Sequence, residues 1–209
     1  MFNNAGITGP NKNSILDYTK SDMEKIVGVN LVGPFLGTKH AARVMIPAGR
    51  GCIISTSSTA AVSAGIASHG YTCTKHAVVG LTKNTAFELG RFGIRVNCVS
   101  PHGVSTPLAT GFVNMTNEEF EGLIASVSNL KGVILKAEDV ANAVLYLASD
   151  DAKYVSGQNL VVTEGSRSVI RALMCSKYNN GCGYVVQWLV VVLYFYVSRK
   201  VLINLLSST

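Results

Sequence analysis

A short apolar run that ends in hydroxyl residues and is followed by a helical pattern limits this chain to few folds. Residues 52–58 (CIISTSS) have the composition of a buried strand. From about Gly70 onward, apolar residues recur with the spacing of one helix face, at Val78, Val79, Leu81, Ala86 and Leu89. A buried strand that leads into a helix predicts an α/β fold with a parallel sheet, whose functional sites form at the carboxyl ends of the strands.

Three side chains around this strand end and helix start have a spacing that suits proton transfer. Ser58 closes the strand pattern, and Tyr71 and Lys75 lie one turn apart on one face if residues 70 onward are helical. A lysine cation favours the phenolate, which predicts that the pKa of Tyr71 lies below its ordinary value of about 10. Ser58 then holds the substrate oxygen. The spacing alone is common on exposed helix faces, so the prediction depends on the strand end and helix start.

Further motifs occur in a fixed order along the chain. They are Asn3-Asn4-Ala5-Gly6, Val29-Asn30-Leu31-Val32-Gly33, Ser58, Tyr71-x-x-x-Lys75, Asn97-Cys98-Val99-Ser100-Pro101, Val104-Ser105-Thr106-Pro107 and Tyr154-Val155-Ser156-Gly157-Gln158-Asn159-Leu160. With these motifs, the chain resembles the short-chain dehydrogenase/reductase family from Phe2 to about Ile170. Within that family it is most similar to the plant secoisolariciresinol, xanthoxin and momilactone dehydrogenase branch.

The resemblance implies a partial Rossmann-type doubly wound parallel sheet that holds only the C-terminal strands and helices of the fold. It also implies an NAD(P)-dependent oxidoreductase that interconverts a secondary alcohol and a ketone by hydride transfer, with Tyr71 as acid and base. By resemblance, Ser58 holds the substrate, Lys75 holds the nicotinamide ribose, and Asn30 bends its helix and holds a relay water. The residues alone leave a simpler interpretation open, in which Asn30 is a tolerated or solvent-facing asparagine inside a helix.

The cofactor-binding residues are also assigned by resemblance. The backbone of Val104 and the side chain of Thr106 match positions that hold the cofactor carboxamide. The full set is Asn3, Asn4, Ala5, Gly6, Tyr71, Lys75, Val104 and Thr106. The branch favours NAD over NADP. His102 stands where the family usually has glycine, and we interpret it as a loop residue without a catalytic role. No Cys-x-x-Cys or His-x-x-x-His spacing occurs, so we expect no metal site.

One element that the family requires is missing from this sequence. A nicotinamide-binding fold begins with a strand, a glycine-rich turn and a helix that receives the pyrophosphate, and on the order of 80 such residues would precede residues 1–6. We therefore expect a truncated chain. The alternative function is an inactive product that associates with full-length relatives, because the two long helices form the subunit interface of the family's homo-oligomers. The strand at residues 1–5 becomes an uncovered sheet edge, which predicts low solubility.

Charge and cysteine content exclude several protein classes. Of the 18 basic and 12 acidic side chains, four basic and no acidic ones lie in residues 171–209, so residues 1–170 hold 14 basic and 12 acidic ones. This balance argues against a nucleic-acid partner. The family resemblance implies a small-molecule alcohol or ketone as the partner. Five cysteines without paired spacing indicate reduced thiols and a cytoplasmic protein. The beginning of the chain does not resemble a signal peptide.

The domain prediction is a truncated family domain at residues 1–170 and a hydrophobic tail outside the family at residues 171–209. The tail contains VVQWLVVVLYFYV at residues 185–197, which is short for a membrane span of about 20 residues. We favour a non-native extension. A membrane-associated tail and a packed helix remain as alternatives.

Capping patterns and periodicity place the other elements. Ser21-x-x-Glu24 predicts the start of a long helix that ends near Pro47, and Thr116-x-x-Glu119 predicts the start of a short helix that closes over the substrate by resemblance. The remaining predictions are a loop at residues 7–18, strands at 94–100 and 158–163, and an amphipathic helix at 137–149.

Overall fold

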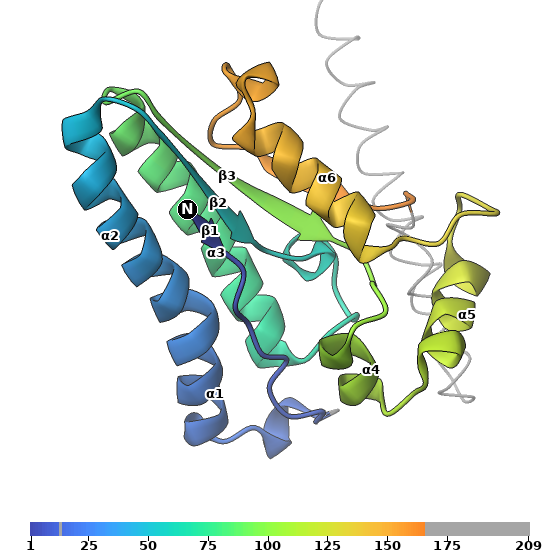
Figure 1. The fold of residues 1–209 in the computed structure, drawn as a ribbon. Coiled ribbons are helices and arrows are strands. Elements are labelled where there is room, and N and C mark those ends of the chain that lie inside the picture. The colour runs from blue at the N-terminus through green and yellow to red at the C-terminus, as the bar shows by residue number, and fades with distance from the viewer. Residues whose placement is uncertain (13, 166–209) are drawn as a thin grey trace, which may run out of the picture. The chain divides into compact units, whose positions relative to one another are not determined.

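Four parallel strands form the sheet in the computed structural model, which describes residues 1–12 and 14–165 (Figure 1). The strands are β1 (Phe2–Asn3), β2 (Gly51–Thr56), β3 (Ile94–Pro101) and β4 (Asn159–Val162), and they lie across the sheet in chain order. Each neighbouring pair is parallel. The predicted α/β fold with a Rossmann-like parallel sheet is therefore confirmed. The predicted tail, residues 171–209, lies outside the described residues.

Different helices cover the two faces of the sheet. Ile53 of β2 and Val96 of β3 are register partners and face α2 (Gly33–Ala48) and α3 (His69–Gly90). The preceding residues, Cys52 and Arg95, point the other way and bond to the Leu147 carbonyl of α6 (Ala137–Ala148). This alternation follows the period of two of a strand. The core of the first face consists of Ala41, Ile53, Ala86, Leu89, Ile94 and Val96. The burial of each large aliphatic side chain there stabilises the folded state by roughly 1.5–3 kcal/mol.

The first long helix is interrupted by one wide turn. It comprises α1 (Lys20–Val27), the π-helix η2 (Gly28–Val32) and α2, and it ends at Gly49, whose φ of 64° lies in the left-handed region. The Gly33 N–H bonds to the Gly28 carbonyl, five residues back. Pro34 has no N–H, so it cannot donate a hydrogen bond to the Asn30 carbonyl four residues earlier. The local irregularity expected around Asn30 and Pro34 is thus present.

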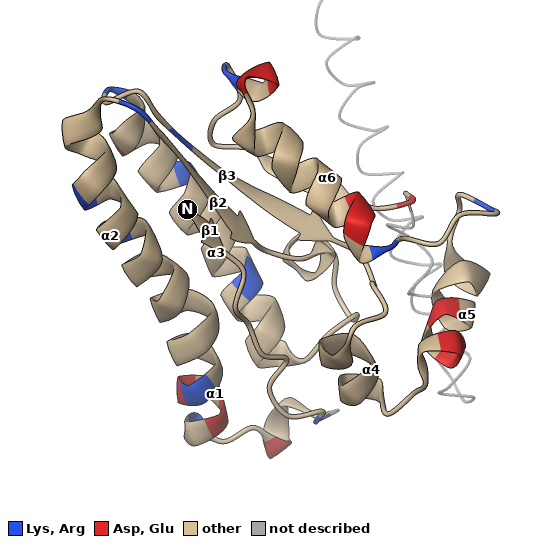
Figure 2. Cartoon of the chain, viewed as in Figure 1, with Lys and Arg blue, Asp and Glu red and all other residues tan. Residues whose placement is uncertain are grey.

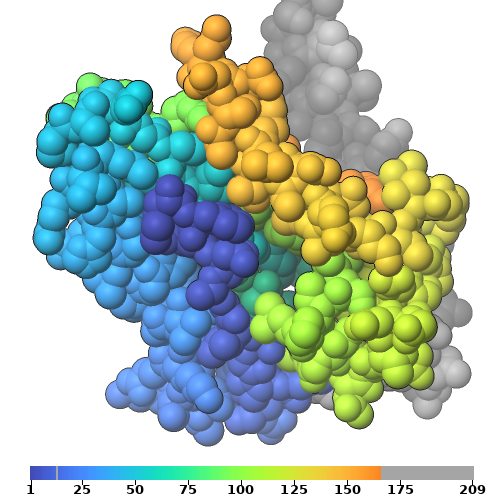
Figure 3. Space-filling model, in the orientation of Figure 1, coloured from blue at the N-terminus to red at the C-terminus, as the bar shows by residue number. Residues whose placement is uncertain are grey.

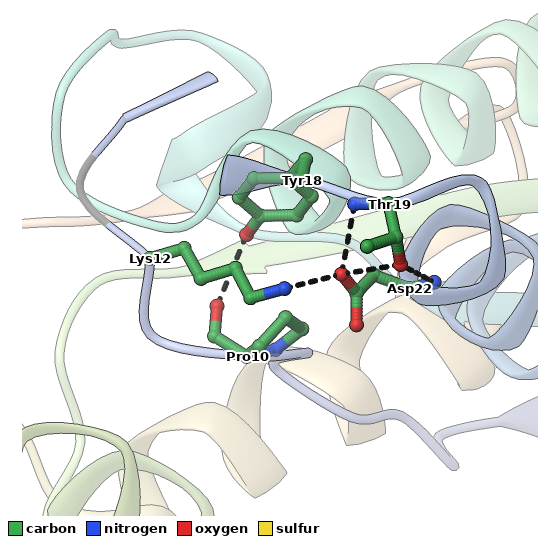
Figure 4. Close-up of polar contacts among 5 residues, drawn as sticks. All are labelled: Pro10, Lys12, Tyr18, Thr19 and Asp22. Atoms are coloured by element: carbon green, nitrogen blue, oxygen red, sulfur yellow. Dashed lines mark hydrogen bonds and ion pairs between the residues drawn. The ribbon is translucent and has the colours of Figure 1, made fainter. Parts of the chain in front are cut away.

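The helix start predicted at Ser21 is wrong by two residues. Thr19 is the N-cap of α1, and it forms a capping box with Asp22 in which each side chain accepts from the other residue's backbone N–H. Asp22 is also bonded to the Lys12 ammonium at 2.6 Å, while the Tyr18 hydroxyl donates to the Pro10 carbonyl (Figure 4). These contacts tie the preceding loop to the helix, and this favours Thr19 over Ser21 as the cap.

The shorter elements connect the strands to the long helices. They are the 3-10 helices η1 (Ile15–Asp17), η3 (Thr59–Ala61) and η4 (Asp150–Ala152), and the helices α4 (Pro107–Val113) and α5 (Asn117–Val127). The loop predicted at residues 7–18 therefore contains one 3-10 turn. The capping box of Thr116 and Glu119 at the start of α5 is confirmed.

Acidic residues lie near the starts of several helices (Figure 2). Acidic residues lie in the first turns of α1, α5 and α6, where they complement the positive end of the helix dipole. Within the described ranges, no helix is both long enough and apolar enough to cross a membrane.

The two candidate caps of α1 can be separated by substitution. Thr19→Ala removes the side-chain acceptor for the Asp22 N–H, so it should lower the free energy of unfolding by about 1 kcal/mol. Ser21→Ala removes an exposed hydroxyl and should change it by less than about 0.5 kcal/mol. Urea unfolding followed by circular dichroism measures both values. Equal losses in the two variants would contradict the assignment of Thr19 as the cap.

Candidate active site

Ser58 lies directly after β2, at the carboxyl edge of the sheet. It caps the 3-10 helix η3, where its hydroxyl accepts from the Ala60 N–H at 3.1 Å. Its side chain also lies near the phenol of Tyr71, whose pKa it lowers. The neighbouring Ser57 hydroxyl is buried and donates to the Lys75 carbonyl at 2.9 Å. The end of β2 is therefore bonded to α3 at the turn that carries Tyr71 and Lys75.

Tyr71 and Lys75 lie one turn apart on α3, as the spacing predicts. The Lys75 ammonium is 5.3 Å from the centroid of the Tyr71 ring. Lys75 is 4% exposed, and its ammonium donates to the Thr56 carbonyl at 2.7 Å. An ammonium carries three donors. The structure thus brings Ser58, Tyr71 and Lys75 together, with a buried positive charge beside the phenol.

Burial sets the electrostatics of this group. It raises the pKa of Tyr71 above its ordinary value of 10, and the hydrogen bond from Ser58 opposes this only in part. Burial also lowers the pKa of Lys75 from 10.5 to about 8. The expectation that the pKa of Tyr71 lies below 10 is therefore wrong for the chain without ligands, because the loss of water outweighs the hydrogen bond that stabilises the phenolate.

Asn30 is 1% exposed and does not face solvent. Its side-chain oxygen accepts from the Ile7 N–H and its amide donates to the Ile7 carbonyl, both at 2.8 Å. The same amide also donates to the Thr74 hydroxyl at 3.2 Å. The solvent-facing interpretation of Asn30 is excluded, and its side chain joins the π-helix η2 to the segment after β1 and to α3.

The predicted cofactor-binding residues at the start of the chain have different surroundings. The buried Asn3 amide donates to the hydroxyls of Thr38 and Ser55, so its side chain ties β1 to α2 and β2. Asn4 accepts from the Thr56 hydroxyl at 2.7 Å, and Ala5 is exposed. A Cβ added to Gly6 would lie 3.4 Å from the Asn30 side-chain oxygen and 3.7 Å from the Lys75 ammonium. The Gly6 backbone thus lies beside these two polar atoms.

Val104 and Thr106 follow β3 on the same edge of the sheet. The Thr106 hydroxyl caps α4 by accepting from the Ala109 N–H, and it also donates to the Val104 carbonyl, with both contacts at 3.4 Å. Among the described residues, no hydrogen bond joins them to Tyr71. Their assigned role in cofactor binding stays a prediction.

His102 is more than an ordinary loop residue in its packing. Its side chain is 7% exposed, and its Nδ1 atom lies 3.6 Å from a carboxylate oxygen of Glu164. Its backbone N–H donates to the Val162 carbonyl at the end of β4. No residue spacing indicates this pair in the sequence, because it depends on β3 and β4 being neighbours. Within the described ranges, no group of three metal-binding side chains is assembled.

Ser68, which no predicted motif includes, is the N-cap of α3. Its hydroxyl accepts from the Tyr71 N–H at 3.3 Å and donates to the Thr8 carbonyl at 2.6 Å. A serine just before a helical pattern is the usual sign of an N-cap and could have identified it.

A hollow opens at the carboxyl ends of the strands. Figure 3 shows it bordered by the N-terminal residues in dark blue, α4 in green and α6 in yellow and orange. The segment after β1 and the helix after β3 both reach it, as expected for a site in an open α/β sheet.

Comparisons with known proteins agree with this geometry. A family model described as enoyl-(acyl carrier protein) reductase matches residues 1–167. Momilactone A synthase of Oryza sativa subsp. japonica is 59% identical over 173 residues, which cover 82% of this chain and 63% of that protein. Secoisolariciresinol dehydrogenase of Forsythia intermedia is 57% identical over 166 residues, which cover 79% of this chain and 60% of that protein.

A solved structure of gluconate 5-dehydrogenase from Burkholderia cenocepacia J2315, in complex with NADP and tartrate, is also similar. Its TM-score is 0.70 at 31% identity, over 80% of this chain and 64% of that one. The chain thus spans 60% to 64% of the length of these three proteins. With the family model and both plant relatives in agreement, this chain belongs to the short-chain dehydrogenase/reductase family, in its plant secoisolariciresinol dehydrogenase-like branch.

Proposed function

We propose that this chain provides the proton-transfer part of an NAD(P)-dependent oxidoreductase that interconverts a secondary alcohol and a ketone. The observation that supports this most is the buried Lys75 ammonium, which lies 5.3 Å from the centroid of the Tyr71 ring, with Ser58 near the same phenol. A hydroxyl donor, a phenol and a buried cation on one strand end and one helix turn match the needs of general acid and base catalysis.

The roles of the side chains follow from their chemistry. In alcohol oxidation, Ser58 donates a hydrogen bond to the substrate oxygen and the Tyr71 phenolate accepts the hydroxyl proton. In ketone reduction, protonated Tyr71 donates that proton instead. The positive charge of Lys75 stabilises the phenolate relative to the phenol. The backbone carbonyl of Asn30 receives no helical hydrogen bond from Pro34, which has no N–H. This carbonyl is the proposed anchor of a relay water that leads to Lys75.

The residues present fit the nicotinamide-ribose end of the cofactor. Gly6 has no side chain beside Asn30 and the Lys75 ammonium, and the Thr56 carbonyl accepts from one of the three donors of that ammonium. Lys75 and Tyr71 would hold the ribose hydroxyls, and Val104 and Thr106 would hold the carboxamide. The bound cofactor supplies the hydride chemistry. The gluconate 5-dehydrogenase structure is a complex with NADP, whereas resemblance to the plant branch favours NAD.

The substrate is proposed to be uncharged and largely apolar. Residues 57–68 and 103–116 border the site after β2 and β3, and neither segment contains Asp, Glu, Lys or Arg. A charged substrate would lose hydration there and gain no partner of opposite charge from these two segments.

A second candidate function is association with other copies or with longer relatives, with or without catalysis. Large apolar side chains remain exposed along the first long helix, and Phe87 of α3 is 91% exposed. Those on the first long helix are Val29, Val32, Phe35, Leu36 and Val44. Exposed apolar residues on two adjacent helices favour a subunit interface. A truncated, inactive chain would retain this function.

Substitution of Tyr71 tests the catalytic proposal. Tyr71→Phe should lower the rate of alcohol oxidation by about 10²–10⁴-fold, because the proton acceptor is lost while the ring is kept. Tyr154→Phe is the matched control, since Tyr154 is fully exposed. The measurement is NADH or NADPH formation with a panel of uncharged cyclic secondary alcohols.

The same assay separates the active from the truncated interpretation. It is run on the 209-residue chain and on a chimera in which the N-terminal segment of the Forsythia relative precedes Met1. Activity of the chimera alone would support a truncated, inactive chain. An active Tyr71→Phe chimera would overturn the catalytic role of Tyr71.

The lowered pKa of Lys75 predicts how stability depends on pH. Between pH 8 and 10.5 the unfolded chain keeps the lysine proton and the folded chain releases it, so stability should rise with pH across this range. A shift from 10.5 to about 8 corresponds to about 3 kcal/mol. Lys75→Met should therefore raise stability at pH 7 and remove this rise, while it abolishes activity. The control is Lys83→Met on the exposed side of α3, whose stability should still rise with pH. Urea unfolding at pH 7 and pH 10 measures the free energy of unfolding of each variant.

The interface proposal predicts a change in mass. Val44→Asp and Phe87→Asp place charges on the exposed apolar faces of α2 and α3, so each should dissociate the oligomer. Light scattering after gel filtration should then give a lower mass than for the wild-type chain. Leu16→Asp is the control, because Leu16 is 89% exposed but lies outside the long helices. A wild-type chain that is already monomeric would contradict the proposal.

A further inference from the structure

Two consecutive residues after β1 are held by side chains from two different helices. The Ser68 hydroxyl at the start of α3 donates to the Thr8 carbonyl at 2.6 Å. The Asn30 side chain in the π-helix pairs with both the N–H and the carbonyl of Ile7. The segment that leaves β1 is therefore fixed at adjacent positions by side chains, without a strand or helix partner.

The same hydrogen-bonded group holds the backbone of Tyr71. The Ser68 hydroxyl accepts from the Tyr71 N–H at 3.3 Å. The Thr74 hydroxyl donates to the Tyr71 carbonyl at 2.9 Å and accepts from the Asn30 amide at 3.2 Å. Two continuous chains of hydrogen bonds thus join the segment after β1 to Tyr71, one from Thr8 through Ser68 and the other from Ile7 through Asn30 and Thr74.

We propose that Ser68 and Thr74 are positioning residues that fix the catalytic Tyr71 relative to the segment after β1, which carries Gly6 of the predicted cofactor site. This inference rests on the proposed function of Tyr71. Neither side chain contacts the reacting atoms. Each hydroxyl acts through the backbone of Tyr71, and together they determine where the phenol lies at the strand edge.

Burial and chemistry make the hydroxyl groups specific to this role. Ser68 is 5% exposed and Thr74 is 1% exposed. Each hydroxyl donates one hydrogen bond and accepts one, which an aliphatic side chain of similar size cannot do. Because each member polarises the next, the removal of one hydroxyl weakens the whole chain of hydrogen bonds.

The surrounding packing leaves little room for adjustment. A Cβ added to Gly70, in the first turn of α3, would lie 2.9 Å from Ile26 of α1, and one added to Gly9 would lie 3.0 Å from the same side chain. The start of α3 and the segment after β1 therefore both press against Ile26. A displaced hydroxyl could not be replaced by a shift of either backbone without a collision.

The role predicts a specific kinetic pattern. If the phenol is displaced by a fraction of an ångström, the residues that bind substrate and cofactor stay in place. The rate of the chemical step should therefore fall more than the affinity for substrate. Thr74→Val and Ser68→Ala should each lower kcat by about 10- to 100-fold with KM within about twofold of wild type. Thr74→Ser keeps the hydroxyl and should stay within about twofold of wild type in both constants.

The test compares these variants with Thr82→Val in one series. Thr82 is a buried threonine on the same helix, 2% exposed, and lies outside the two hydrogen-bond chains. kcat and KM are measured on whichever of the 209-residue chain and the chimera is active. The ¹³Cζ resonance of Tyr71 is measured by NMR on the 209-residue chain and is assigned with the Tyr71→Phe variant. We expect the resonance to shift in Thr74→Val and Ser68→Ala and to stay in place in Thr74→Ser and Thr82→Val.

The NMR measurement requires no activity, so it still decides the positioning role if the proposed oxidoreductase function fails. A Tyr71 resonance that is unchanged in both Thr74→Val and Ser68→Ala would overturn the inference. An equal shift in Thr82→Val would also overturn it, because any buried hydroxyl of α3 would then have the same effect. A variant that does not fold is replaced by Thr74→Ala or Ser68→Gly in the same comparison.

Discussion

The buried ammonium of Lys75 is the constraint on which the rest of this site depends. Removing a charged group from water is costly, and here the cost lowers the pKa of Lys75 to about 8 while the Thr56 carbonyl offsets part of it. Hydrophobic packing alone would not select a lysine at this position. The ammonium instead lies near the backbone of Gly6 and near the Tyr71 ring. The positive charge beside Tyr71 therefore lowers the stability of the folded chain at neutral pH.

The arrangement around Lys75 depends on an irregular helix as much as on the sheet. A regular helix between residues 20 and 48 would place a different set of side chains toward α3, because each residue turns by a fixed angle. The π-helix at Gly28–Val32 changes this phase, and Asn30 lies inside it with both of its side-chain polar atoms bonded to Ile7. Such single wide turns occur frequently at functional sites. Pro34 maintains the irregularity, since it removes the donor that would restore a regular hydrogen bond to Asn30.

The sequence predicts local order and motif order well, and side-chain partners less well. The strand at β2, the helix that carries Tyr71 and the parallel sheet follow from periodicity and from strand-to-helix alternation. The predicted cap of α1 is misplaced because Ser21 and Thr19 have similar patterns, and only the hydrogen bonds between Thr19 and Asp22 in the folded chain show which one is used. The direction of the Tyr71 pKa shift is missed because a nearby charge is visible in the spacing, whereas the depth of burial is a property of the folded chain. The contact of His102 with Glu164 joins residues that are remote in sequence, so no local pattern reveals it.

In the proposed function, proton transfer and pyrophosphate binding use separate parts of this architecture. The side-chain hydrogen bonds of Ser58, Lys75 and Asn30 all go to groups between Ile7 and Thr74. The pyrophosphate of a dinucleotide is bound elsewhere in such folds, at the start of a helix after a glycine-rich turn. The geometry of the proton-transfer group is therefore complete without that turn. Because binding energy is what holds a nicotinamide ring against the reacting carbon, a complete proton-transfer group is necessary for the proposed reaction but does not suffice for it.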